Sequence, residues 1–237
     1  MFINQILKET SLKSYTIIAA IILGMGLVIA AGSSLRDSMV LKHPKKMTVI
    51  EKKERFRELI VPAVDAVHKD LEKQYQEVSD LIDKDPESKK LEQLREQYNT
   101  KTNKSLLIAI NPHPRSIAIA QAALESSWAT SRFARQANNL FGVWSFNEDE
   151  PRLAARQKRG KTTIWIKKYD SIEDSIRDYY LILSKGKAYR SFKRLNMTTN
   201  DPEQLVTKLD KYSEKGAAYG VALMSVIRHN DFTQYDQ

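Results

Sequence analysis

The chain has 237 residues, a formal net charge of +9 and 28% charged residues, enough for one medium-sized domain with appendages. It contains no cysteine, which excludes disulfide frameworks, thiolate zinc sites and thiol nucleophiles. The 4 histidines show no metal-ligand spacing and the chain has no glycine-rich phosphate loop, so the sequence predicts no metal or nucleotide cofactor.

An uncharged stretch at residues 15–32 lies close to the N-terminus. A cleavable signal peptide has an apolar run of about 7 to 15 residues, whereas about 18 apolar residues can just span a bilayer. We therefore expect residues 1–35 to be a signal anchor whose transmembrane helix holds the protein in the cytoplasmic membrane. Cleavage near residues 30–33 is the alternative. Basic residues flank both ends of the stretch, so the charge distribution does not fix its orientation.

A helical region is predicted over residues 48–104, after a polar linker at residues 36–47. Its apolar residues recur at three-to-four spacing with charges on the other face, the pattern of an amphipathic helix. Pro62 is expected to kink this helix or to mark its restart. Asp85 and Pro86 end it, and a second amphipathic piece follows. We expect this region to pack on, or lead to, a domain of residues 105–237.

The next predicted helix begins after Pro114, a residue type that suits a helix start. Residues 119–124 are mostly small and apolar, and Glu125 follows them, so its carboxylate is expected in a crowded place near the helix end. Burial and the helix dipole both raise a carboxyl pKa there. A protonated Glu can act as the general acid that glycoside hydrolysis requires. The alternative is a surface Glu that is solvated or paired with Arg132.

Aromatic residues on and after this helix are candidates for substrate binding, since pyranose faces pack on aromatic rings. The candidates are Trp128, Phe141 and Trp144, together with the amide of Asn139. Core packing is the alternative for Trp128, Phe141 and Trp144, and capping of the preceding helix is the alternative for Asn138 and Asn139.

The remaining elements are predicted from propensity and capping. Residues 141–145 and 162–169 are rich in β-branched and aromatic types and predict a small hairpin or short sheet. Helices are predicted after Ser171, after Asp201 and over residues 219–227. The fold class is therefore mainly α with a small β lobe.

A run of basic residues lies between Glu150 and Asp170, with no acid among them. Its members are Arg152, Arg156, Lys158, Arg159, Lys161, Lys167 and Lys168. Such a run favours an anionic polymer as partner, although a solvated loop is the alternative. Cell-wall glycan, nucleic acid and anionic lipid all qualify. We expect no nucleic acid, because the run has one aromatic residue and a membrane anchor would place the domain on the wrong side.

Several separated motifs resemble the glucosaminidase domain of bacterial autolysins and of the flagellar rod muramidase. They are QAALESSW at residues 121–128, NNLFG at 138–142, YDS at 169–171 with DY at 178–179, and the segments 212–216 and 227–230. The chain resembles the bacterial Bax-like branch of this family more closely, from about residue 52 to residue 230.

The resemblance implies an α+β, lysozyme-like domain that acts on peptidoglycan glycan strands outside the cytoplasmic membrane, on its periplasmic side, without a cofactor. The implied reaction is hydrolysis of a β-1,4 bond between amino sugars. Glu125 is then the general acid. Tyr212 matches a family tyrosine that faces this acid, where a phenol could bind the substrate's acetamido group or the developing charge.

One feature departs from the family's hydrolytic members, which often carry a second acid on the β lobe. Residues 151–169 contain no acid. Glu148, Asp149 or Glu150 could substitute, the acetamido oxygen of the substrate could act as internal nucleophile, or activity could be weak or absent. A lytic transglycosylase that uses a lone Glu is one alternative function. A peptidoglycan-binding scaffold without activity is another.

Overall fold

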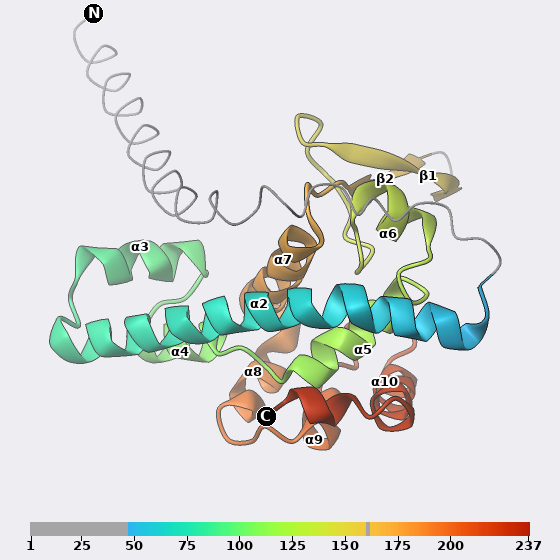
Figure 1. The fold of residues 1–237 in the computed structure, drawn as a ribbon. Helices are drawn as coiled ribbons and strands as arrows, with labels where there is room; N and C mark the ends of the chain where they lie inside the picture. The colour runs from blue at the N-terminus through green and yellow to red at the C-terminus, as the bar shows by residue number, and fades with distance from the viewer. Residues whose placement is uncertain (1–46, 160–161) are drawn as a thin grey trace, which may run out of the picture. The chain divides into compact units, whose positions relative to one another are not determined.

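Helices dominate the part of the chain that the computed structural model describes, residues 47–159 and 162–237 (Figure 1). The helices are α2 (Val49–Lys84), α3 (Lys89–Gln97), α4 (Asn103–Ile110), α5 (Arg115–Glu125), α6 (Arg132–Ala137), α7 (Ile172–Lys185), α8 (Arg190–Asn196), α9 (Pro202–Val206) and α10 (Ala217–His229), with short 3-10 helices η1 (Lys187–Tyr189) and η2 (Phe232–Tyr235). In these residues the strands β1 (Arg152–Arg159) and β2 (Thr162–Lys167) form a two-stranded sheet. The predicted mainly helical fold with a small sheet is confirmed.

The predicted membrane anchor at residues 1–35 lies outside the described residues, as does most of the predicted linker. Among the residues that are described, no helix is long and apolar enough to cross a membrane.

The long helix α2 begins at a capping box, in which Thr48 Oγ1 accepts from the Glu51 backbone N–H at 3.2 Å and Glu51 Oε2 accepts from the Thr48 N–H at 2.7 Å. One face of α2 is buried, including Phe56 and Val64. α2 continues through Pro62, so the predicted possibility of a restart there was wrong. Packing of the apolar face on both sides of Pro62 holds the helix together where one backbone hydrogen bond is missing.

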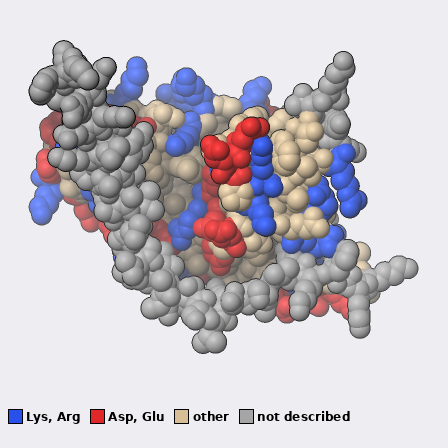
Figure 2. All heavy atoms as spheres, turned by 90° about the horizontal axis from the view of Figure 1, so that it is seen from above, with Lys and Arg blue, Asp and Glu red and all other residues tan. Residues whose placement is uncertain are grey.

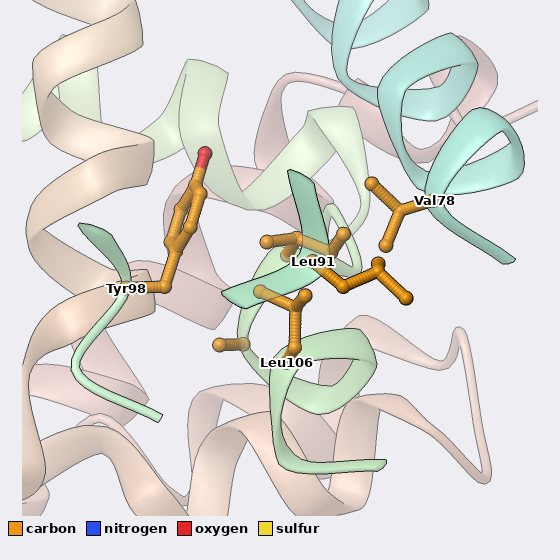
Figure 3. Close-up of a cluster of buried hydrophobic side chains, with 6 residues drawn as sticks. Val78, Leu91, Tyr98 and Leu106 are labelled. Carbon is orange, nitrogen blue, oxygen red and sulfur yellow. The ribbon is translucent and has the colours of Figure 1, made fainter. Parts of the chain in front are cut away.

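A lobe of three helices, α2, α3 and α4, encloses its own apolar cluster (Figure 3). The cluster consists of Val78, Leu91, Tyr98, Leu106, Ala109 and Ile110. α4 joins the lobe to the rest of the fold by contacts with α7 and α8. The sequence did not predict α4, and the boundary predicted between residues 104 and 105 falls within it.

Leu91→Ala is expected to lower the free energy of unfolding by about 2 to 5 kcal/mol, because Leu91 is fully buried in this cluster and the change leaves a cavity. Urea unfolding followed by circular dichroism measures it. The matched control is Leu94→Ala on the same helix. Leu94 is only partly buried, so this change should lower the free energy of unfolding less. Equal losses for both variants would contradict the packing described.

The strand predictions were only partly right. β2 agrees with the predicted strand at 162–169, but residues 141–145 contribute only the isolated bridge between Trp144 and Ile166. The partner of β2 is β1, antiparallel, with Arg152 opposite Lys167 and an irregularity after Ala154. β1 has no β-branched residue, so local propensity could not reveal it, and pairing with β2 fixes its extended conformation.

α5 lies at the centre of the fold, with contacts to α2, α9, α10 and η2. Every residue from Ser116 to Ala123 is buried, which explains the run of small and apolar side chains. The helix begins directly after Pro114, as predicted, and Pro114 makes no side-chain capping bond. The helix that carries Glu125 is therefore held on most of its sides, and only its two ends, at Arg115 and at Leu124 and Glu125, reach the surface.

Candidate active site

Glu125 is the last residue of α5, and an unusual turn ends the helix directly after it. Ser127, Trp128 and Ala129 all have left-handed backbone conformations, with φ values of 53°, 61° and 58°. Such conformations cost roughly 1–2 kcal/mol for each residue other than glycine. The Ala129 N–H donates to Ser126 Oγ at 2.7 Å and the Trp128 N–H to the Ala123 carbonyl at 2.8 Å, which helps to offset this cost. The turn fixes the Glu125 carboxyl at the negative end of the helix.

The pKa of the Glu125 carboxyl is raised, chiefly by burial, while a hydrogen bond from Tyr219 and the charge of Lys215 act in the opposite direction. More than a third of the Glu125 residue is nevertheless accessible to solvent. The carboxyl therefore lies in a partly enclosed position that a ligand can reach. Arg132, the alternative partner considered for Glu125, donates to the Ala154 carbonyl at 2.6 Å.

A pair of stacked tyrosines lies beside this carboxyl. Tyr219 of α10 donates to Glu125 Oε1 at 2.9 Å. Tyr212, the residue singled out by the sequence, stacks on Tyr219 with ring centroids 5.3 Å apart. Burial raises the pKa of Tyr212, and the negative charge of Glu125 raises it further. Both phenols therefore stay protonated and can donate a hydrogen bond near Glu125.

Two of the predicted aromatic candidates serve the core. Phe141 is buried and stacks on Tyr179 with ring centroids 4.1 Å apart. Trp128 packs edge-on against Phe56, with centroids 5.2 Å apart, and the Lys53 ammonium lies 4.9 Å from its ring centroid. These contacts favour the core alternative for Phe141 and Trp128, and substrate binding by either ring stays a prediction.

Asn139 makes structural contacts, and its role in substrate binding stays a prediction. Its side chain is 1% exposed. It donates to the carbonyls of Val143 and Lys167 at 3.0 and 2.9 Å and accepts from the Val143 N–H at 3.0 Å. These bonds tie the loop after α6 to β2. Asn138, with φ of 48°, is the left-handed C-cap of α6, as the capping alternative predicted.

Trp144 is the predicted aromatic residue that stays open to solvent, at 40% exposure. Phe146, 86% exposed, lies close to it, with ring centroids 6.2 Å apart. The sequence analysis missed Phe146. Two neighbouring exposed rings form a surface on which sugar rings can pack.

The acidic loop after Trp144 is tied to the basic segment. Glu148 pairs with Arg152 at 3.2 Å, and Glu150 lies 3.8 Å from Lys167, which also pairs with Asp178 at 3.0 Å. Asp149 is exposed. Basic side chains are interspersed with acidic and uncharged ones on the face shown in Figure 2. Arg152 and Lys167 are thus partly neutralised where the sequence predicted a purely basic run.

Sequence reasoning also missed Tyr219 and Gln121, although both lie in motifs it quoted or helices it predicted. Gln121 is fully buried and donates to the Tyr219 hydroxyl at 3.0 Å. A buried polar residue one helical turn before Glu125 was the available signal, because buried amides need partners. In residues 47–159 and 162–237 no group of three or more His, Asp or Glu side chains could hold a metal ion.

A family model described as mannosyl-glycoprotein endo-beta-N-acetylglucosaminidase matches residues 101–232. The match covers more than half of the 237 residues and includes Glu125 and both tyrosines. The chain belongs to this glucosaminidase family, and the family membership predicted from its motifs is confirmed.

The chain is also similar to individual members of this family. It is 30% identical over 132 residues to protein bax of Escherichia coli, which is 53% of this chain and 46% of that protein. It is 26% identical over 132 residues to the exo-glucosaminidase LytG of Bacillus subtilis, 52% of this chain and 46% of that protein. The matched segment thus spans about half the length of these relatives. The catalytic domain of the autolysin Auto from Listeria monocytogenes superposes with a TM-score of 0.48 at 21% identity, over 85% of this chain and 95% of that one.

Proposed function

We propose that the protein is a peptidoglycan hydrolase that cleaves a β-1,4 bond between amino sugars. The specificity that we favour is that of a β-N-acetylglucosaminidase. The observation that carries this proposal is Glu125 at the end of α5, with its pKa raised and Tyr219 bonded to it, in a chain of the glucosaminidase family. The experiment is the release of soluble fragments from purified peptidoglycan by the full chain, compared with its Glu125→Gln variant.

In this proposal Glu125 protonates the glycosidic oxygen as the bond breaks. The departing sugar alkoxide is too basic to leave alone, and general acid catalysis contributes roughly two to four orders of magnitude. The raised pKa keeps the proton on Glu125 at higher pH than for an ordinary Glu. A phenol from Tyr212 or Tyr219 can stabilise the developing charge or hold the acetamido group. The mainly helical fold with its small sheet supports a lysozyme-like architecture.

A lytic transglycosylase is the second candidate, and one observation favours it. Besides burial, the groups that shift the pKa of Glu125 are the Tyr219 hydroxyl and the Lys215 ammonium, and neither is a carboxylate. The acids considered as its partner are exposed or engaged with basic side chains. A lone Glu suits a reaction in which a substrate hydroxyl or acetamido oxygen replaces the second carboxylate.

We also propose that the protein acts outside the cytoplasmic membrane and that residues 15–32 anchor it there. The location of peptidoglycan and the length of the uncharged stretch support this. The anchor is tested by extracting membranes with carbonate: the full chain should stay in the membrane fraction, and release into solution would contradict an uncleaved anchor.

Replacing both exposed rings, Trp144→Ala with Phe146→Ala, is expected to raise KM for glycan about tenfold and to change kcat less. Each stacking contact contributes about 0.5–1.5 kcal/mol, and a factor of ten corresponds to about 1.4 kcal/mol. Steady-state kinetics on soluble glycan strands measure this. Val221→Ala, at another exposed apolar residue, is the matched control. An unchanged KM in the double variant would exclude these rings from substrate binding.

A further inference from the structure

A chain of hydrogen bonds runs from Glu125 into the core. The Tyr219 hydroxyl lies 2.9 Å from Glu125 Oε1 and 3.0 Å from the side-chain amide nitrogen of Gln121. The amide oxygen of Gln121 lies 2.5 Å from the Tyr179 hydroxyl, which is 3.0 Å from His113 Nε2. Gln121, Tyr179 and His113 are all buried, so water cannot replace a missing partner in this chain.

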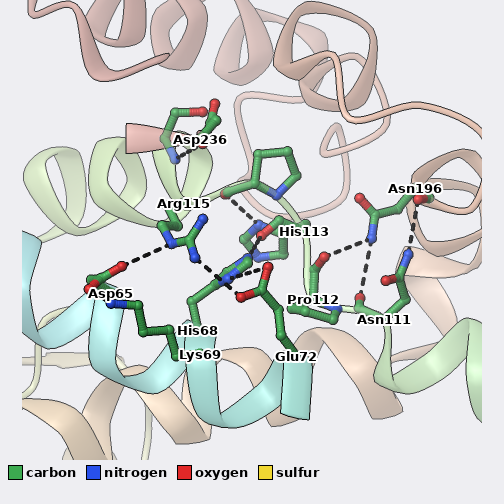
Figure 4. A network of polar contacts seen from close by, with 12 residues as sticks. Asp65, His68, Lys69, Glu72, Asn111, Pro112, His113, Arg115, Asn196 and Asp236 are labelled. Atoms are coloured by element: carbon green, nitrogen blue, oxygen red, sulfur yellow. Dashed lines mark hydrogen bonds and ion pairs between the residues drawn. The ribbon is translucent and has the colours of Figure 1, made fainter. Parts of the chain in front are cut away.

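The far end of the chain is a neutral histidine. Burial lowers the pKa of His113 to about 3, so its ring carries one proton at neutral pH. Its Nδ1 lies 3.1 Å from the Pro114 carbonyl oxygen, which can only accept. Figure 4 shows this ring within a polar network that reaches Arg115 and His68. A proton on Nδ1 satisfies the Pro114 carbonyl and leaves Nε2 as an acceptor for Tyr179.

Each hydroxyl in the chain has one proton, so the chain has two possible directions. In the outward direction Tyr179 donates to the Gln121 oxygen, the Gln121 nitrogen donates to Tyr219, and Tyr219 donates to Glu125; the 2.5 Å separation suits such an O–H···O bond. This direction suits an ionised Glu125, and it leaves His113 Nε2 without a donor unless Nε2 itself carries the ring proton. A neutral His113 then has no proton on Nδ1 for Pro114.

In the inward direction every bond is reversed, with the Gln121 amide turned over. The two ends of an amide are interchangeable in shape, so this reversal needs little movement. Tyr179 then donates to His113 Nε2, and Tyr219 donates to Gln121. The Tyr219 oxygen is left to accept from Glu125, which must be protonated. This direction satisfies every partner, including the Pro114 carbonyl.

We propose that Gln121, Tyr179 and His113 are positioning residues whose chain favours the protonated, acid-competent Glu125, because a proton held on His113 Nδ1 leaves Nε2 to accept from Tyr179. When Glu125 gives its proton to the leaving oxygen, the Tyr219 and Tyr179 hydroxyls rotate and the Gln121 amide turns over, so that Tyr219 donates to the ionised carboxylate and His113 Nε2 loses its donor; reprotonation of Glu125 restores the inward direction. Every hydroxyl, amide and ring proton stays on its own atom during this reversal, and the only proton transferred is that of Glu125. This inference rests on Glu125 being the general acid of the proposed function.

Other titratable groups surround both ends of the hydrogen-bond chain, and the variants used in the test leave them unchanged. Tyr212, Tyr219 and Lys215 influence Glu125 from α10 and the segment before it. At the other end, the ring of Tyr180 from α7 stacks on His113 with centroids 4.6 Å apart. From α2, His68 Nε2 lies 3.0 Å from the His113 carbonyl oxygen, and the positive charge of Arg115 from α5 acts on His68.

Tyr179→Phe tests the coupling, with Tyr180→Phe as the matched control. Both hydroxyls are buried on adjacent residues, and the Tyr180 hydroxyl has no hydrogen-bond partner among the described residues. The pKa of Glu125 is read directly by carbon-13 NMR of the full chain labelled at Glu side-chain carboxyls, with the signal assigned from Glu125→Gln. Tyr179→Phe should lower this pKa by on the order of half to one unit, the equivalent of one net hydrogen bond. Tyr180→Phe should leave it unchanged.

The alkaline limb of the rate profile should follow this pKa, moving to lower pH in Tyr179→Phe and staying in place in Tyr180→Phe. Equal Glu125 pKa values in Tyr179→Phe and Tyr180→Phe would overturn the coupling. If Tyr179→Phe does not fold, Gln121→Met removes the chain one step nearer to Glu125 and should lower the pKa likewise. The NMR reading needs no turnover. If Tyr179→Phe shifts the pKa of Glu125 but the protein cleaves no glycan, the proposed function is refuted and the coupling stands. If the protein cleaves glycan but the pKa does not shift, the coupling is refuted and the proposed function stands.

Discussion

Glu125→Gln is expected to lower the rate of glycan cleavage at least about a hundredfold, because an amide cannot supply the proton that the leaving oxygen needs. The fold should be unchanged, since Glu125 is partly exposed at the end of α5 and Gln is nearly the same shape. Initial rates on purified peptidoglycan measure the loss, and thermal unfolding checks the fold. Glu96→Gln, the same change at an exposed residue of α3, is the matched control and should retain full activity.

Residual activity above about 1% of the wild-type rate would contradict an essential general acid, given the expected size of that contribution. The same assay identifies any second carboxylate. A comparable loss in Glu148→Gln, Asp149→Gln or Glu150→Gln would show that the loop after Trp144 supplies it. Full activity in all three would favour a reaction with a lone Glu, as in the transglycosylase alternative.

Tyr219→Phe is expected to lower kcat about ten- to a hundredfold with little change in KM. The Tyr219 hydroxyl contacts Glu125 at 2.9 Å, and a hydrogen bond to a charged group contributes about 1.5–3 kcal/mol. The direct bond lowers the pKa of Glu125, whereas the chain behind Tyr219 is proposed to raise it. Tyr219→Phe removes both effects, so its test is the loss of kcat and not a shift of the rate profile with pH.

Tyr212→Phe is the informative comparison for this variant. Tyr212 stacks on Tyr219, and the family resemblance assigns the stabilising role to Tyr212. A large loss in Tyr212→Phe with near-normal activity in Tyr219→Phe would support that assignment and contradict the role of Tyr219.

The sequence predicted helices where a local signal marked them. The amphipathic face of α2, the proline before α5 and the caps of α7 and α9 are such signals, and the structure contains all four helices. β1 carries no such signal, because its extended form depends on pairing with β2 far more than on its own residues. The helical pattern around Glu125 was predicted to continue to Gln136, but α5 ends at Glu125 and α6 is a separate helix. No glycine marks the left-handed turn at residues 127–129 that divides them.

In the candidate site, too, some residues carry a local signal in the sequence and others are brought together only by tertiary packing. Glu125 could be found because an acid after an apolar helical run is unusual. Phe141 and Asn139 lie in a quoted motif, but a motif does not tell which side chains face the core, and both are buried. Tyr219 could not be separated from the apolar residues of α10, because its contact with Glu125 joins residues 94 positions apart in the chain. Such contacts follow from tertiary packing and leave no local pattern.

Mass spectrometry of borohydride-reduced muropeptides tests the central claim most directly. The full chain is incubated with purified peptidoglycan beside its Glu125→Gln variant, and the new glycan ends are identified. We predict new ends that depend on Glu125, with reduced N-acetylglucosamine for a glucosaminidase; reduced muramic acid would indicate a muramidase, and anhydro ends a transglycosylase. A folded wild-type protein that binds peptidoglycan but releases no new ends, or ends that form equally with Glu125→Gln, would contradict the account.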